Sequence, residues 1–128
     1  MNIEQKVKAI VAALEDIKAK DIAVLDTTKM TAMFERMVIA SGDSNRQTRA
    51  LANHVRDTMK EASVYVGNME GEQTGEWVLL DLGDVIVHVM QPAVRTLYNL
   101  EELWSAGAAV RSQNVEQRSK KSPIKTET

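Results

Sequence analysis

Residues 75–90 read GEWVLLDLGDVIVHVM, and this stretch constrains the fold more than any other part of the chain. It contains two runs rich in valine, leucine and isoleucine, one on each side of a Leu82-Gly83 dipeptide. Apolar runs separated by two turn residues predict two β-strands joined by a tight hairpin. With the loop at Leu82-Gly83, Trp77 is expected to lie opposite His88.

The two faces of this hairpin differ in chemistry, because side chains alternate along a strand. The predicted core face is purely aliphatic and consists of Val78, Leu80, Val85, Val87 and Val89. The other face, here called the mixed face, consists of Trp77, Leu79, Asp81, Asp84, Ile86, His88 and Met90. An apolar sheet face with a polar rim marks a partner site if it is exposed, and is ordinary core if more chain covers it. The sequence leaves both interpretations open.

Helices and further strands are predicted around the hairpin. Apolar residues three and four positions apart predict amphipathic helices over residues 3–17 and 45–62, the second opened by a Ser44–Gln47 capping box. The other expected elements are buried strands at 21–27 and 37–40, an edge strand at 64–66, a helical turn from Pro92 to Tyr98, and a helix over 100–106 with an Asn99–Glu102 capping box. This order predicts an α/β (α+β) domain with a mixed sheet of four or five strands, one face of which the two long helices cover.

Length and composition limit the remaining possibilities. A chain of 128 residues, 44% of them hydrophobic, suffices for one domain with a core. It has no cysteine, which excludes disulfides, thiolate metal sites and cysteine nucleophiles. Charges interrupt the N-terminal apolar pattern every few residues, so we expect neither a signal peptide nor a membrane span, and a cytoplasmic protein.

Charge is distributed unevenly along the chain. The segment from Gly107 onward carries a net charge of +3 and the preceding part −5, which together give the overall −2. We therefore expect a domain over residues 1–107 and a disordered, weakly basic tail over residues 108–128. So acidic a body is a poor general binder of nucleic acid. The outer face of the second long helix is basic, however, and is either a solvated surface or a minor RNA contact; it carries Arg46, Arg49, Arg56 and Lys60.

The candidates for catalysis are few. Asp81 and Asp84 flank the hairpin turn, where aspartate commonly bonds nearby backbone N–H groups, and with Asp26 they are the candidate carboxylates for a divalent ion. The stretch SGDSN at residues 41–45 opens a helix, a geometry that can hold a phosphate, but it lacks the lysine and glycines of a P-loop. We expect no catalytic residue, metal or cofactor, with a nucleotidyltransferase-like nucleotide-binding protein or enzyme as the alternative.

Three segments, in this order, resemble the ribosomal silencing factor family, also called Iojap-like proteins, as a bacterial member: VLDTTKM, FERMVIASGDSNRQTRALANHV and GEWVLLDLGDVIVHVMQPAVRTLYNLEELW. The resemblance covers residues 3–106. It implies a nucleotidyltransferase-like fold without the catalytic residues, and a translational repressor. Such a protein would bind the large ribosomal subunit through its fourteenth protein and sterically block joining with the small subunit, mainly under nutrient limitation. The family often has Ala-Asp-Tyr-Phe before VIASG, where this chain has Ala-Met-Phe-Glu-Arg-Met.

The resemblance assigns partner contact to the mixed face and its surroundings. Trp77 would be the anchor, and Leu82, at the tip of the hairpin, would reach outward. The complete expected set is Trp77, Leu79, Leu82, Ile86, His88, Met90, Arg95 and Tyr98. If the same face closes a homodimer, dimerisation and ribosome binding would compete.

Overall fold

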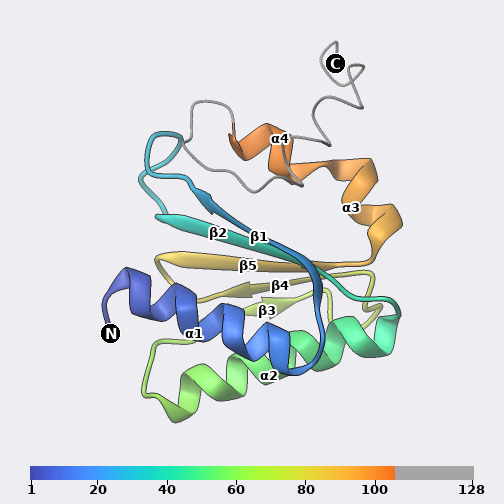
Figure 1. The fold of residues 1–128 in the computed structure, drawn as a ribbon, viewed down its shortest axis with the longest axis horizontal. Coiled ribbons are helices and arrows are strands. Elements are labelled where there is room, and N and C mark those ends of the chain that lie inside the picture. Colours follow the sequence, from blue (N-terminus) through green and yellow to red (C-terminus); the bar gives the residue numbers. More distant parts are fainter. Residues whose placement is uncertain (106–128) are drawn as a thin grey trace.

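The computed structural model describes residues 1–105 as one five-stranded sheet with helices on both faces (Figure 1). The elements are α1 (Ile3–Asp16), β1 (Lys20–Asp26), β2 (Arg36–Ser41), α2 (Asn45–Glu61), β3 (Met69–Glu70), β4 (Trp77–Asp81), β5 (Val85–Met90), α3 (Pro92–Tyr98) and α4 (Leu100–Ser105). The predicted mixed α+β class is confirmed. The predicted tail and the expected helix end at Ala106 lie outside the described residues.

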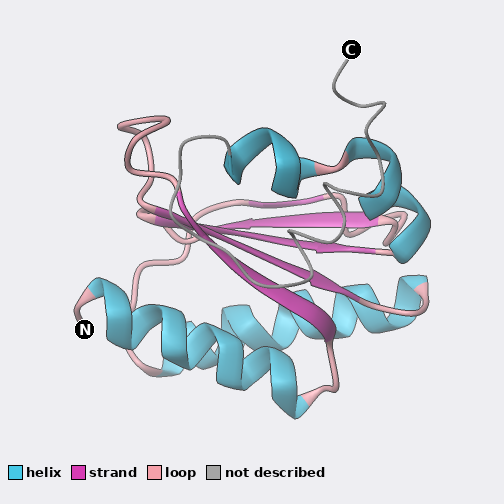
Figure 2. Cartoon of the chain, turned by 45° about the horizontal axis from the view of Figure 1, so that its top comes forward, coloured by secondary structure: helices cyan, strands magenta, loops and turns pink. Residues whose placement is uncertain are grey.

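The sheet is mixed, with strand order β1-β2-β5-β4-β3. Only β2 and β5 run parallel; the other neighbouring strands are antiparallel. Figure 2 shows α1 and α2 on one face of the sheet and the shorter α3 and α4 on the other. The two long helices therefore cover one face, as predicted, but the opposite face carries a partial second layer. Within residues 1–105, no helix is both long and apolar enough to cross a membrane.

The main core lies between the long helices and the aliphatic face of the hairpin. The residues of α2 that face the sheet are buried, namely Thr48, Leu51, Ala52, Val55 and Met59, whereas Ala62 is the exposed C-cap. They pack with α1 against the buried aliphatic residues of the hairpin. Each fully buried Leu or Val contributes about 1.5–3 kcal/mol relative to an exposed one. This core fixes which face of the hairpin points away from the long helices.

The helix caps follow the predicted chemistry only in part. Ser44 accepts a hydrogen bond from the backbone N–H of Gln47 (3.0 Å), but the Gln47 side chain accepts from Asp43 instead of returning to Ser44. Asn99 does not form the expected capping box, because it adopts the left-handed conformation (φ 46°) that ends α3. Its backbone carbonyl, and not its side-chain oxygen, accepts from the N–H of Glu102.

The hairpin register differs from the prediction by two residues. The turn is Gly83-Asp84, closed by a bond from the Leu82 N–H to the Val85 carbonyl (2.9 Å). Gly83 has φ +87°, which favours glycine at the first position of a two-residue turn. Trp77 therefore pairs with Met90, and Leu79 pairs with His88. A shift by two residues preserves the alternation, so the predicted division into two faces holds although the partners change.

The edge strand beyond β4 was predicted too early in the chain. Residues 64–66 form no strand; instead Val64 and Val66 pack as partly buried residues against the main core. The strand that pairs with β4 is β3, through Met69 opposite Leu80 and Glu70 opposite Leu79.

Candidate functional site

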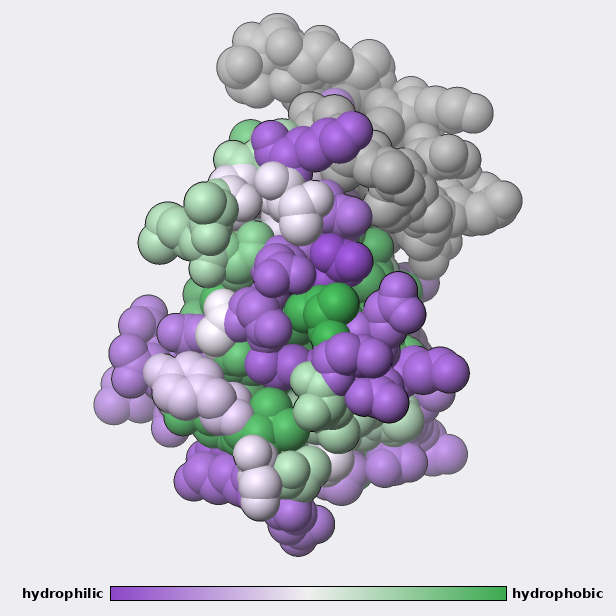
Figure 3. All heavy atoms as spheres, turned by 90° about the vertical axis from the view of Figure 1, so that its left-hand side faces the viewer, coloured by the Kyte–Doolittle hydropathy of each residue, from purple (hydrophilic) through white to green (hydrophobic). Residues whose placement is uncertain are grey.

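The mixed face is covered unevenly by the second helical layer. On the β1 and β2 side, Leu25, Met37 and Ile39 are buried in a smaller apolar cluster against which α4 packs. On the β4 and β5 side, Trp77, Leu79, Asp81 and Ile86 remain partly exposed. The sheet therefore presents an apolar surface only over its hairpin half. Figure 3 shows the end of the molecule at which the hairpin turns, where hydrophobic surface is broken up by hydrophilic residues.

Three rings form a continuous row along this half of the sheet. Tyr98, at the end of α3, lies 4.8 Å from Trp77 between ring centroids, and Trp77 lies 5.8 Å from His88. Tyr98 is 54% exposed, whereas His88 is only 6% exposed. Aromatic contacts at these distances orient the rings, so Trp77 is held in place from both sides. The sequence prediction that Trp77, His88 and Tyr98 belong together is consistent with this arrangement.

The contact between Trp77 and His88 also fixes the state of the imidazole. The indole N–H of Trp77 can only donate, and it donates to Nδ1 of His88 (2.9 Å). The proton of the neutral ring is therefore on Nε2. Burial lowers the pKa of His88 from 6.5 to about 4, so the ring is neutral at physiological pH.

A groove opens beside this row, between the hairpin, the loop after β1 and the helix α4. Its volume is about 370 Å³, and it is lined by Met33, Phe34, Met37, Leu79, Asp81, Gly83, Ile86, His88, Leu100 and Trp104. Leu79, Ile86 and His88 were expected here, but the residues from the loop and from α4 were not. Phe34 and Trp104 contact each other with ring centroids 5.4 Å apart, which closes one wall. Aromatic residues make up only 4% of the chain, so their rarity alone could have marked Phe34 and Trp104 as candidates for the site.

The expected exposure of Leu82 was wrong, and three further expected contact residues, His88, Met90 and Arg95, are also buried. Leu82 and Met90 are fully buried, and Arg95 is 2% exposed. Leu82 precedes the turn instead of forming it, so its side chain points into the main core. Met90 pairs with Trp77 at the end of the hairpin and belongs to the smaller cluster. Leu82, Met90 and Arg95 shape the surface from beneath without being open to a partner.

Arg95 is occupied by a buried ion pair. Its Nε and one terminal nitrogen donate to the two carboxylate oxygens of Glu101 (3.0 and 2.7 Å), and the other terminal nitrogen donates to Ser41 (2.8 Å). A guanidinium bound on both sides in this way is a rigid cross-link. It ties α3 to α4 and to the end of β2, and thereby positions the wall of the groove.

The three candidate carboxylates are each bound by local partners. Asp81 accepts from the N–H of Gly83 (2.8 Å), and Asp84 pairs with the nearly buried Lys6. The hydroxyl and backbone N–H of Thr28 donate to Asp26 and hold its pKa below the usual value. No group of three His, Asp or Glu side chains among residues 1–105 is arranged to hold a metal ion. The carboxylates serve the turn and the connection to α1.

The remaining chemical candidates are also engaged in local structure. Ser44 of the SGDSN stretch caps α2, and Ser41 accepts from Arg95. His54, on α2, is partly exposed, and its Nε2 lies 3.1 Å from a carboxylate oxygen of Asp16. The arrangement that stands out in the described residues is therefore a contact surface.

Comparisons with known proteins show the family to which the chain belongs. A family model described as "Ribosomal silencing factor during starvation" matches residues 1–128, further than the expected 3–106. The Chromobacterium violaceum protein named Ribosomal silencing factor RsfS is 57% identical over 104 residues, 81% of this chain and 85% of that protein. A crystal structure of a Chromobacterium violaceum protein has a TM-score of 0.81 and 54% identity, and covers 88% of this chain and 92% of that one.

A more distant relative extends the comparison beyond bacteria. The Mus musculus protein named Mitochondrial assembly of ribosomal large subunit protein 1 is 30% identical over 100 residues, which are 75% of this chain and 43% of that protein. The names of these relatives refer to ribosomal silencing and to assembly of the ribosomal large subunit. On the full-length family match and the 57% identity, the chain belongs to the ribosomal silencing factor family, as its sequence motifs indicated.

Proposed function

We propose that this protein represses translation in the cytoplasm by binding the large ribosomal subunit through its fourteenth protein. Bound there, it blocks joining with the small subunit, chiefly when nutrients are scarce. Family membership supports the silencing role, and the name of the mouse relative supports the choice of the large subunit. The observation that carries the docking part is the apolar surface over β4 and β5, with its groove.

We call this area the docking surface: Trp77, Leu79, Ile86, His88, Tyr98 and the groove beside them. Its rings are held by one another, so little rotational freedom is lost when a partner binds. Met33, 83% exposed at the edge of the groove, adds a flexible side chain that adapts to the partner. Among residues 1–105, none accepts a hydrogen bond from Nε2 of His88, so this N–H is left for an acceptor of the partner.

The mechanism is competition by excluded volume. A protein of 14.2 kDa cannot cover a subunit interface, but it needs only to occupy space into which the other subunit must dock. Repression then depends on the fraction of large subunits occupied, and no chemical turnover is required. Loss of a central aromatic contact typically costs about 2–4 kcal/mol, which is roughly a thirty-fold to thousand-fold loss of affinity.

The docking surface can be tested with two matched substitutions. Met33→Glu places a carboxylate at the groove, whereas Leu97→Glu places one on α3 at a side chain that is 75% exposed and outside the groove. Both positions are exposed, so both variants are expected to fold. Sedimentation with purified large subunits should show binding weakened about ten-fold or more by Met33→Glu, because an apolar contact would have to bury a charge. Leu97→Glu should bind like the wild type.

Equal binding by the two variants would exclude the groove as the contact, and no sedimentation of the wild type with large subunits would contradict the proposal.

Light scattering of the wild type alone tests the homodimer alternative. If the docking surface closes a dimer, Met33→Glu should produce monomers and adding the ribosomal protein should dissociate the wild-type dimer.

A further inference from the structure

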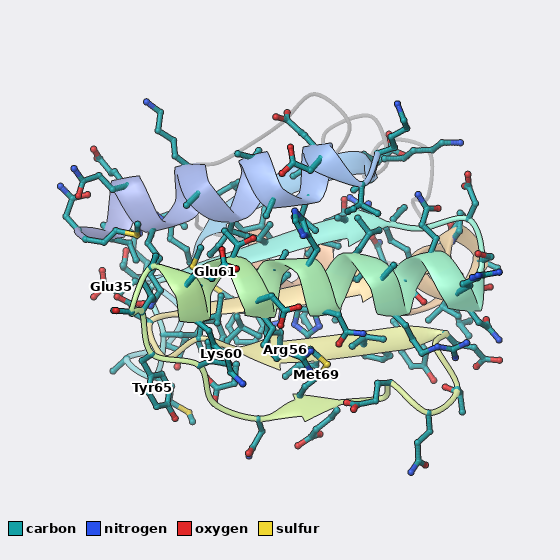
Figure 4. All side chains as sticks on the ribbon, turned by 90° about the horizontal axis from the view of Figure 1, so that it is seen from below. Glu35, Arg56, Lys60, Glu61, Tyr65 and Met69 are labelled. Carbon is teal, nitrogen blue, oxygen red and sulfur yellow. The ribbon has the colours of Figure 1, made fainter. Side chains whose placement is uncertain are left out.

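A second surface lies on the opposite side of the sheet, along α2. Four cations, Arg46, Arg49, Arg56 and Lys60, lie at spacings that return to one side of an α-helix. They fall within an arc of about 80° and extend over about 21 Å of the helix axis. In Figure 4, Arg56 and Lys60 lie on the side of α2 that faces Met69 of β3, and Glu61 lies on the other side. We call these four residues the basic stripe.

The basic stripe is poorly neutralised, whereas four other Lys and Arg side chains of the domain are paired with carboxylates. Ion pairs elsewhere join Lys6 to Asp84, Lys20 to Asp43, Arg36 to Asp26 and Arg95 to Glu101. Within the stripe only Arg56 has a carboxylate at pairing distance, that of Asp57 (3.1 Å). Arg49 donates to the backbone carbonyl of Gln73 (3.5 Å). Glu61, Glu70 and Glu72 are close along the chain or at the sheet edge, but none forms a described ion pair with the stripe.

Two of these cations are also placed against the electrostatics of their own helix. Arg46 and Arg49 lie near the N-terminus of α2, where backbone N–H groups already give a positive potential, and the first turn contains no acidic residue. A residue that lowers the stability of its own helix, with no compensating interaction inside the protein, is expected where the side chain serves binding. A concentrated positive charge of this kind attracts an anionic partner.

We propose that the basic stripe binds the sugar–phosphate backbone of an RNA duplex, without reading its sequence. Arginine forms bidentate hydrogen bonds with phosphate, and three of the four cations are arginines. A lipid surface fits less well, because the apolar residues of α2, such as Leu51 and Val55, are fully buried against the sheet and unavailable for insertion. At about 0.15 M salt the screening length is about 8 Å, so acidic residues on distant faces do not cancel the stripe.

The stripe and the docking surface lie on opposite sides of the sheet, so both can be occupied at once. The RNA contact does not rest on the proposed function, since it requires no ribosomal protein. An experiment can therefore contradict the RNA contact without contradicting the proposed function, and the reverse.

The test uses the full chain and a fluorescein-labelled RNA duplex of twenty base pairs, followed by fluorescence anisotropy from 50 to 200 mM KCl. Four phosphate contacts predict a slope of about −3.6 in log K against log salt for a duplex, a loss of about 150-fold over this range. The variant R46Q/R49Q/R56Q/K60Q should lose this binding. The variant R46Q/K60Q, changed at two exposed positions, should make the slope shallower by about 1.8.

The matched control is R118Q/K120Q/K121Q/K125Q, which removes the same number of positive charges outside the described residues and should bind like the wild type. Trp77→Ala should also bind the duplex normally, even if it no longer binds large subunits. Circular dichroism melting verifies that each variant is folded. The proposal is overturned if the wild type does not bind at 50 mM salt, or if the control loses as much binding as the stripe variant. Tighter binding to vesicles containing phosphatidylserine than to the duplex would overturn it as well.

Discussion

At position 88 an imidazole lies in the middle of the docking surface and is 6% exposed. Protonation would place a charge in this buried position and would remove the acceptor on which the Trp77 indole relies. Because its pKa in the folded protein is about 4 and its ordinary value is 6.5, the unfolded chain binds the proton more readily. The stability associated with neutral His88 is therefore complete above pH 6.5 and is lost as the pH falls towards 4.

A substitution at this position should remove that acid sensitivity. When the pH falls from 7 to 5, the titration of His88 should lower the free energy of unfolding by about 2 kcal/mol. Asn at position 88 can still accept from the Trp77 indole but does not titrate. Urea unfolding at the two pH values should therefore show a smaller drop for His88→Asn than for the wild type, whereas a His54→Asn control should keep the drop. Equal drops for wild type and His88→Asn would contradict this account.

Single residues also show how far the sequence alone could predict the site. Alternation along the hairpin correctly grouped Trp77 with Leu79, Ile86 and His88 on one face. The prediction that Leu82 is exposed was wrong, because the sequence allows the turn at either Leu82-Gly83 or Gly83-Asp84. Leu82 is buried only when the turn is Gly83-Asp84, as in the structure. For Arg95, charge suggested a surface residue, and no sequence pattern indicates that a carboxylate six residues away is buried with it.

Among the elements, α2 combines a well-predicted structure with an unusual charge pattern. Its apolar spacing predicted both its length and its buried side, because those residues must cover the sheet. Arg46 disfavours the first turn of α2. An acidic residue at this position would interact favourably with the helix dipole, whereas a cation is repelled by it.

The Arg46→Glu variant tests this conflict between stability and binding. Replacing the cation by a carboxylate at the helix N-terminus should increase the free energy of unfolding by about 0.3–1 kcal/mol at low salt. The same variant should bind the RNA duplex more weakly. Urea unfolding and anisotropy measure the two effects, and Arg46→Gln is the control that removes the positive charge without adding a negative one. A variant that is less stable than the wild type would contradict the electrostatic explanation.

The groove shows what element-by-element prediction cannot supply. Its walls come from the loop after β1, from the hairpin and from α4, and Phe34 and Trp104 are seventy residues apart in the sequence. The expected Asn99–Glu102 capping box suggested the short helix that the structure shows as α4 (Leu100–Ser105), but a capping pattern contains no information on which strand that helix packs against. The packing of α4 on β1 leaves the hairpin half of the sheet open and so creates the docking surface.

At the scale of the whole molecule, one sheet separates two surfaces of different chemistry. The face with α3 and α4 offers rings and an apolar groove, and the face with α1 and α2 offers the basic stripe. The carboxylates that suggested an enzyme are engaged in the turn, in an Asp–Thr contact and in the pair with Lys6. This arrangement supports an account in which the protein acts by occupying a place on a large partner.

The most direct test of that account is subunit joining. Purified large subunits are preincubated with the protein, small subunits are added, and the rise in light scattering reports formation of complete ribosomes. The wild type and Leu97→Glu should suppress this rise in proportion to their occupancy of the large subunit, and Met33→Glu should require about ten-fold or more protein for the same suppression. Full joining of subunits at saturating wild-type protein would contradict the central claim.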